Sequence, residues 1–116
     1  YKSLVKQMMT MPSVKLAQPD QLCYSSAHCH AMSTGNTGYT GHDRQTDECK
    51  QVKKYNGECF HYGRANPVAI VLSLLIDEDV ESLGHREICF TGYPKIAASI
   101  QPHKGYSWVT VIDFLF

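Results

Sequence analysis

Apolar residues recur at helical spacing in the first third of the chain. The pattern over Leu4–Met11 predicts the end of an amphipathic helix that stops before Pro12. It is already under way at the first residue, so we expect the first turns of this helix to be missing. A second helix is predicted over residues 19–33, and its stripe of small side chains favours close packing against a sheet.

The middle of the chain is polar and shows little periodicity. We expect residues 34–66 to form one long loop. A loop of this length in a small domain is usually functional or cross-linked. Both interpretations fit here, because the segment contains His42, Cys49, Glu58 and Cys59.

Asn66-Pro67 predicts the start of a third helix, because Asn is a favourable N-cap and Pro suits the first helical position. The β-branched content of the following residues also permits a strand, but the length and the cap favour a helix. The buried stripe is expected to comprise Val68, Val71, Leu72 and Leu75, widened by Ile70 and Leu74. An acidic cluster over residues 77–81 ends the apolar run.

The last third predicts a β-hairpin with strands over Lys95–Gln101 and Tyr106–Phe116. In the second strand one face is expected to carry Trp108, Ile112 and Phe114, and the other Val109, Val111 and Leu115. Apolar residues on both faces indicate a strand that is covered on both sides. The predicted fold class is therefore α+β: a three-layer α-β-α sandwich with a small antiparallel sheet between helices, formed by residues 1–116 as a single domain.

Composition narrows the classes of function. Eleven Lys and Arg residues balance eleven Asp and Glu residues, which argues against a nucleic-acid-binding protein that relies on bulk positive charge. The longest apolar run, Val68–Ile76, is too short to span a bilayer. We therefore expect neither a nucleic-acid partner nor a transmembrane segment.

The chain contains five cysteines, a density more usual outside the cell than in the cytosol. Cys49 and Cys59 flank a polar segment and are the favoured disulfide pair. Cys23 and Cys29 lie on one predicted helix with a rise between them of roughly 9 Å, which is too far for a disulfide. The alternative is a set of buried free thiols in a reducing compartment.

Six histidines are the most informative excess in the composition. His28 and His30 lie about 200° apart around a predicted helix, so they cannot bind one metal together, and we expect both to be partly exposed. His42 and His85 differ from them because each follows a glycine in a predicted loop.

Short motifs follow one another in a recognisable order: Leu16, Asp20 and Leu22; Gly41-His42; Tyr55-Asn56-Gly57-Glu58-Cys59; Val71–Asp77; Gly84-His85-Arg86-Glu87-Ile88; and Tyr106–Val111. This order resembles the CAP superfamily, the SCP-like domains of cysteine-rich secretory proteins, antigen 5 and plant pathogenesis-related 1 proteins. The resemblance covers nearly the whole chain. It departs from the family at Cys59, where the family has Asn, and at Leu74, where it has Trp.

The resemblance implies a cleft lined by two histidines and two acids: His42, Glu58, Asp77 and His85. Asp79 and Glu81 are alternatives to Asp77 as the second acid. Two neutral imidazoles with a carboxylate or water suit a divalent metal, zinc first, with His42 and His85 as its ligands. The same groups can serve as acid and base, but no recognisable nucleophile accompanies them.

The function that the resemblance implies is a secreted or cell-surface binding module, periplasmic if the protein is bacterial, with binding favoured over catalysis. Its expected partners are divalent metals, sterols or other lipids, and proteins. A basic or apolar rim around the cleft would indicate a lipid. One alternative is a peptidase-like hydrolase that uses the same cleft. Another is a purely structural protein-interaction domain, in which the polar residues only tie the long loop to the core.

Overall fold

The structure, a computed structural model, describes residues 2–11, 16–76 and 84–116. Its central layer is a sheet with the strand order β1-β3-β4-β2. The strands are β1 (Gln18–Pro19), β2 (Gly57–Tyr62), β3 (Lys95–His103) and β4 (Ser107–Leu115). Strands β2 and β3 each pair antiparallel with β4, whereas the short β1 pairs in parallel with β3. The sheet is therefore small, as predicted, but mixed rather than purely antiparallel.

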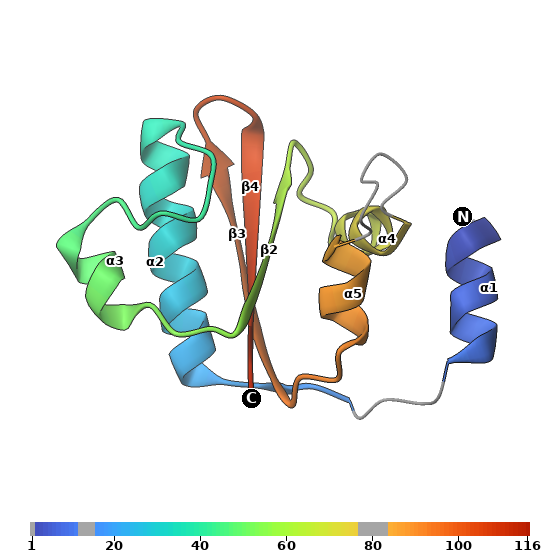
Figure 1. Cartoon of the computed structure of the whole chain (residues 1–116). Coiled ribbons are helices and arrows are strands. Elements are labelled where there is room, and N and C mark those ends of the chain that lie inside the picture. The colour runs from blue at the N-terminus through green and yellow to red at the C-terminus, as the bar shows by residue number, and fades with distance from the viewer. Residues whose placement is uncertain (1, 12–15, 77–83) are drawn as a thin grey trace.

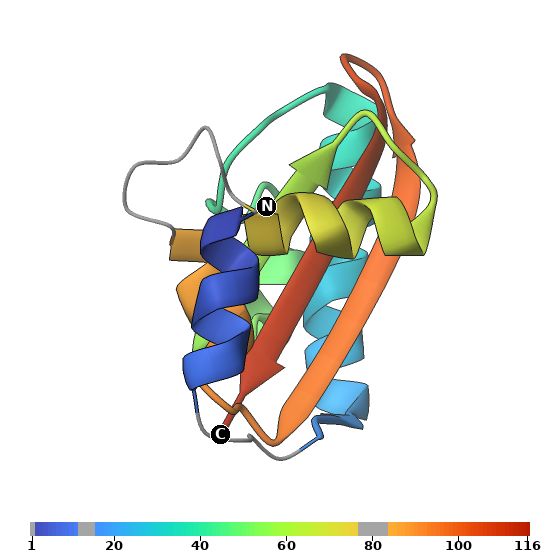
Figure 2. The ribbon, with the colours of Figure 1, turned by 90° about the vertical axis from the view of Figure 1, so that its right-hand side faces the viewer.

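Helices cover both faces of this sheet (Figure 1). One face carries α2 (Gln21–Thr37) and α3 (Asp47–Val52). On the other side lie α1 (Lys2–Thr10), α4 (Pro67–Ile76) and α5 (Gly84–Phe90), and Figure 2 looks onto this helical layer with the sheet behind it. The predicted α+β class with helices on both sides of the sheet is confirmed.

The C-terminal hairpin is also confirmed, with β3 and β4 paired from Lys95 opposite Leu115 to His103 opposite Ser107. Successive residues of β4 point to opposite faces and enter two different cores. On one face Val109 and Val111 pack against small residues of α2, Ala27 and Ala31. On the other face Ile112 and Phe114 pack with Ile70 and Leu74 of α4.

Trp108 does not belong to either core, contrary to the prediction. It is 38% exposed and lies beside the hairpin turn, opposite Pro102. The apolar alternation of β4 therefore holds from Val109 onward and fails at its first turn-proximal residue.

The predicted start of α4 is confirmed, but its predicted buried stripe is right only at Ile70 and Leu74. Asn66 caps the helix by accepting a hydrogen bond from the Ala69 backbone N–H. Ile70 and Leu74 face the core, whereas Val68, Val71 and Leu72 are exposed. Because α4 is apolar on nearly every side, no polar face in the sequence marks which side meets solvent.

The predicted long loop contains two regular elements that the sequence analysis missed. Helix α2 continues to Thr37 and ends at Gly38, whose φ of 83° is the left-handed conformation that glycine adopts readily. Helix α3 begins after Thr46, which accepts a hydrogen bond from the Cys49 backbone N–H. Strand β2 lies at an edge of the sheet and carries polar residues, so its alternation is hidden.

Arg86 joins the helices of the outer layer. Its guanidinium donates to the backbone carbonyls of Leu75 and Ile76 at the end of α4, at 2.5 and 2.6 Å. It also donates to the Ser3 hydroxyl of α1 at 2.8 Å. The arginine of the Gly-His-Arg motif therefore satisfies carbonyls that the helix end leaves open, and it fixes α1 and α5 to α4.

Candidate functional site

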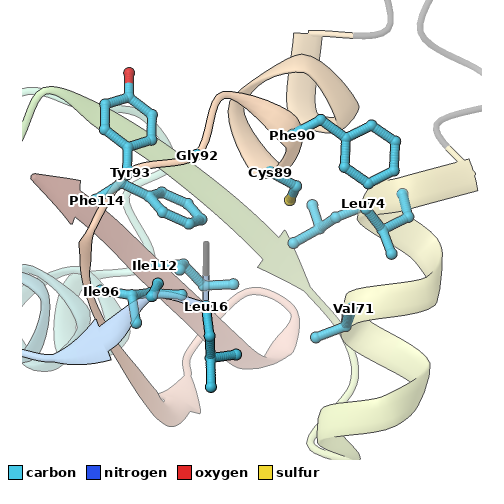
Figure 3. A pocket seen from close by; sticks show the side chains of 12 residues that line it. Leu16, Val71, Leu74, Cys89, Phe90, Gly92, Tyr93, Ile96, Ile112 and Phe114 are labelled. Atoms are coloured by element: carbon cyan, nitrogen blue, oxygen red, sulfur yellow. The ribbon is translucent and has the colours of Figure 1, made fainter. Parts of the chain in front are cut away.

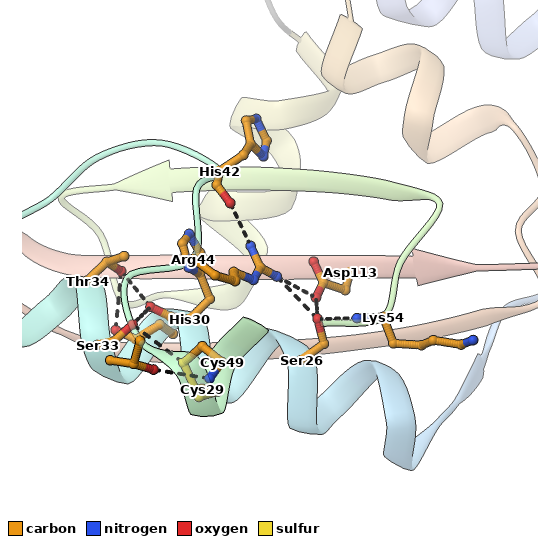
Figure 4. Close-up of a disulfide and its surroundings, with 12 residues drawn as sticks. Ser26, Cys29, His30, Ser33, Thr34, His42, Arg44, Cys49, Lys54 and Asp113 are labelled. Atoms are coloured by element: carbon orange, nitrogen blue, oxygen red, sulfur yellow. Dashed lines mark hydrogen bonds and ion pairs between the residues drawn. A yellow bond between two sulfur atoms is a disulfide. The ribbon is translucent and has the colours of Figure 1, made fainter. Parts of the chain in front are cut away.

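Three buried ionisable residues, Arg44, Glu58 and Asp113, meet between α2 and the sheet. Arg44 donates two hydrogen bonds to the carboxylate of Glu58, at 2.9 and 2.7 Å, from the segment that leads into α3. The guanidinium nitrogen that makes the second of these bonds, Nη2, also lies 3.5 Å from Oδ2 of Asp113 in β4. Ser26 of α2 donates to the same carboxyl group at 2.7 Å, and Figure 4 shows Arg44, Ser26 and Asp113 together. A buried guanidinium thus joins a loop, a helix and two strands.

The two carboxyl groups of this network ionise very differently. Burial alone would raise the pKa of Glu58, but hydrogen bonds from Arg44, Asp113 and His42 outweigh it and hold the pKa at about 2. Burial raises the pKa of Asp113 to about 9, helped by the hydrogen bond and the charge of Glu58. At neutral pH the pair therefore holds one proton, on Asp113, while Glu58 balances the charge of Arg44.

His42 links this network to the surface. Its Nδ1 lies 2.9 Å from Glu58 Oε1, and its side chain is 58% exposed. The ring also packs 4.3 Å from the ring of Phe60, centroid to centroid. A carboxylate that orients a histidine is typical of metal ligands and of general bases. The structure therefore brings together two of the four predicted site residues.

His85 belongs to different surroundings. It lies in the first turn of α5 rather than in a loop. Burial lowers the pKa of the nearby His61, and the electrostatic effects of Arg64 and His85 lower it further. In β2, Glu58 and Phe60 alternate with Cys59, which packs in the core beside α4. His61 shares the face of Cys59, so β2 carries the surroundings of His42 and of His85 on opposite faces. Asp77, Asp79 and Glu81 lie outside the described residues.

His42 and Glu58 are potential metal donors that meet at this place. Over residues 2–11, 16–76 and 84–116, no three His, Cys, Asp or Glu side chains lie close enough to hold one metal ion together. Glu58 already bonds Nδ1 of His42, which leaves Nε2 as the ring nitrogen for a ligand. A zinc site at His42 and His85 stays a prediction from the resemblance, and Asp77, the predicted second acid of the cleft, lies outside the described residues.

His30 is buried, contrary to the expectation of partial exposure. It is only 1% exposed, and its Nε2 lies 2.7 Å from the Gly41 carbonyl oxygen. Burial lowers the pKa of His30, which keeps the ring neutral. His30 therefore holds the residue that precedes His42 against α2.

The disulfide joins Cys29 of α2 to Cys49 of α3 (Figure 4), so the predicted Cys49–Cys59 pairing is wrong. The unforeseen helix α3 is the reason. It turns Cys49 back toward α2, whereas Cys59 enters the core on the opposite side of β2. The bond fastens the short α3 to the long α2.

An apolar cavity of about 420 Å³, which the sequence analysis missed, lies between the sheet and the layer of α4 and α5 (Figure 3). Side chains from α4, α5, the sheet and the segment before β1 line it: Leu16, Ala17, Val71, Leu74, Leu75, Cys89, Phe90, Tyr93, Ile96, Ile112 and Phe114, with Gly92. Its lining is mostly apolar. No local motif marks it, because its walls come from segments far apart in the sequence.

Comparisons with protein-family models, with curated proteins and with solved structures found no match. The resemblance to the CAP superfamily therefore rests on the order of motifs in the sequence.

None of the helices within the described residues is both long enough and apolar enough to cross a membrane.

Proposed function

We propose that the protein is a secreted CAP-like binding module that holds an apolar ligand, such as the hydrocarbon chain of a lipid, in the cavity between α4, α5 and the sheet. The observation that carries the proposal is the cavity itself. Its volume of about 420 Å³ lies in the range of small-molecule sites, which are concave and mostly apolar. Protein interiors are otherwise packed with few voids larger than a water molecule.

The chemistry of the cavity selects the class of ligand. Its walls present aliphatic and aromatic carbon, with the thiol of Cys89 and the phenol of Tyr93 as the side-chain polar groups among the lining residues. A charged or strongly polar ligand would lose its hydration there without finding partners. A hydrocarbon chain loses only unfavourable contact with water. Among metals, lipids and proteins, the partners that the resemblance implies, this lining favours a lipid.

Binding is favoured over hydrolysis by the surroundings of the charged groups. The His42–Glu58 pair belongs to the α2 side of β2, whereas the cavity lies on the α4 side. Ser26, which contacts the same buried network, donates a hydrogen bond to Asp113. Its hydroxyl is therefore held by a carboxyl group, not activated by a base.

The Cys29–Cys49 disulfide supports the secreted location in this proposal, because disulfides persist mainly in oxidising compartments. It joins α2 to α3, whereas the proposed ligand site lies on the other side of the sheet.

A pair of matched substitutions on α4 tests the proposal. Val71 lines the cavity, whereas Val68, one turn earlier on the same helix, is 68% exposed and does not line it. We expect Val71→Phe to weaken binding of a long-chain fluorescent fatty acid by about tenfold or more, because pocket contacts of this size are worth roughly 1–3 kcal/mol. Val68→Phe should bind as the wild type does.

The measurement is a fluorescence titration in solution, with thermal melts to show that both variants fold. Equal affinity in the wild type and both variants would mean that the probe binds elsewhere. Absence of binding to the wild type would contradict the proposal directly.

A further inference from the structure

Large apolar side chains gather on the exposed surface of one layer. More than half of the exposed large apolar residues of the described chain lie in α1, in α4 or at Leu16 between α1 and β1: Val5, Met8, Met9, Leu16, Val68, Val71 and Leu72. Met9 is 81% exposed and Leu16 is 83% exposed. Surface apolar residues that cluster in this way mark interaction sites, whereas scattered ones need no explanation.

This apolar surface of α1, Leu16 and α4 is continuous with the cavity. Leu16 and Val71 are both exposed and both line the cavity, so they form part of its rim. Helices α1 and α4 lie in the same outer layer (Figure 2). The surface therefore adjoins the apolar site at Leu16 and Val71.

Helix α1 is oriented to present such a surface. Leu4 is buried, and Ser3 and Gln7 on the same side of the helix bond to Arg86 of α5. The opposite side presents Val5 and Met9 to solvent. The side of the helix with Ser3, Leu4 and Gln7 therefore holds it to the protein, and apolar residues face outward on the other side.

We infer that this surface docks on a lipid bilayer, from which a hydrocarbon chain enters the cavity; the second step rests on the proposed function. The charges of the helices favour this occupant. Lys2 and Lys6 are exposed on α1, which carries no acidic residue, and α4 carries no charged residue at all. Apolar residues with flanking lysines are typical of helices that lie in the membrane interface, where lysine meets anionic headgroups.

The balance of charge sets the expected dependence on lipid. Only two lysines contribute from α1, and the sequence places four acids directly after α4, over residues 77–81. Docking is therefore driven mainly by apolar insertion, and anionic lipid adds a modest increase. Vesicles of phosphatidylcholine should bind the protein, and vesicles with added phosphatidylserine should bind it more tightly.

Two substitutions on this surface have matched partners on the opposite side of the sheet. Met9→Glu and Val68→Glu change the proposed docking surface, whereas Met32→Glu and Leu22→Glu change exposed residues of α2. We expect the first two to reduce vesicle binding in flotation by about tenfold or more, because a carboxylate would have to enter the apolar interface. The α2 variants should bind within about twofold of the wild type.

Thermal melts of all four variants show whether each one folds. If Val68→Glu does not fold, Met9→Glu alone carries the test. Wild-type protein that fails to float with either kind of vesicle overturns the inference, as does equal loss in the α1 and α2 variants. Light scattering could instead show a wild-type dimer that Met9→Glu dissociates, with no vesicle binding. That result would assign the surface to a second copy of the chain and would also overturn the inference. Fatty-acid binding in vesicle-free solution, lost in Val71→Phe, would show that the cavity proposal survives such a result.

Discussion

The two faces of the sheet are covered in different ways. On the α2 side, small residues such as Ala27 and Ala31 allow the helix to pack closely on Val109 and Val111. A disulfide and the buried Arg44 fasten the neighbouring segments there. On the other side, α4 and α5 leave a cavity of about 420 Å³ against the sheet.

The difference separates structural chemistry from ligand chemistry in this molecule. Glu58, a predicted site residue, is neutralised by Arg44, and the neighbouring Asp113 holds a proton. The apolar residues of α4 and the sheet, which the sequence predicts to form an ordinary core, leave a cavity between themselves and α5. The close-packed side should therefore respond strongly to loss of polar partners, and the hollow side to changes of volume.

The largest expected effect is on the close-packed side. Glu58→Gln removes the charge that balances the buried Arg44, and we expect the free energy of unfolding to fall by about 3–5 kcal/mol. The measurement is denaturant unfolding at pH 5. Asp113→Asn is the matched control, because Asn resembles the protonated carboxyl group, and it should cost less than about 1 kcal/mol. Equal losses in the two variants would mean that Asp113 is ionised.

The disulfide should have the next largest effect. Cys49→Ser removes the bond to Cys29, and we expect the free energy of unfolding to fall by roughly 3 kcal/mol, a model-dependent value from loop entropy. A reductant should lower the melting temperature of the wild type and leave that of Cys49→Ser unchanged. Peptide mapping without reduction that recovers a Cys49–Cys59 pair would contradict the structure.

The dependence of stability on pH should reveal the shared proton. Folding raises the pKa of Asp113 from 3.8 to about 9, so its favourable contribution is complete below about pH 4 and is lost as the pH rises toward 9. Folding lowers the pKa of Glu58 from 4.5 to about 2, so its contribution is present above about pH 4.5 and is lost as the pH falls toward 2.

Melting temperatures between pH 5 and pH 9 measure the first of these effects. We expect wild-type stability to decline across this range and the decline to be smaller in Asp113→Asn, which has no proton to lose. Parallel curves for the two proteins would assign the decline to other groups.

The smallest effect is expected at Trp108. Because this side chain is 38% exposed and lies outside both cores, Trp108→Ala should cost about 1 kcal/mol, whereas truncation of a buried aromatic costs about 3–5 kcal/mol. Phe114→Ala on the same strand is the comparison, since Phe114 is only 6% exposed. Denaturant melts in which Trp108→Ala costs as much as Phe114→Ala would place Trp108 in the core after all.

Much of the fold follows from signals between residues close in the sequence. Asp20 and Asn66 cap α2 and α4 where the sequence predicts helices to begin, and the hairpin of β3 and β4 follows from its alternation and its turn. A candidate signal for the buried network was also present. Asp113 is a lone acid in an apolar strand, and a buried acid needs a partner or a proton.

What only the tertiary structure decided depends on residues far apart in the chain. The partner of Cys49 depends on an unforeseen helix, and the side that α4 buries depends on where the sheet lies. The cavity arises from segments that approach without filling the space between them, and no single segment carries a sign of that. Capping and alternation are local and can be read along a chain, whereas the space left between elements depends on how all of them pack.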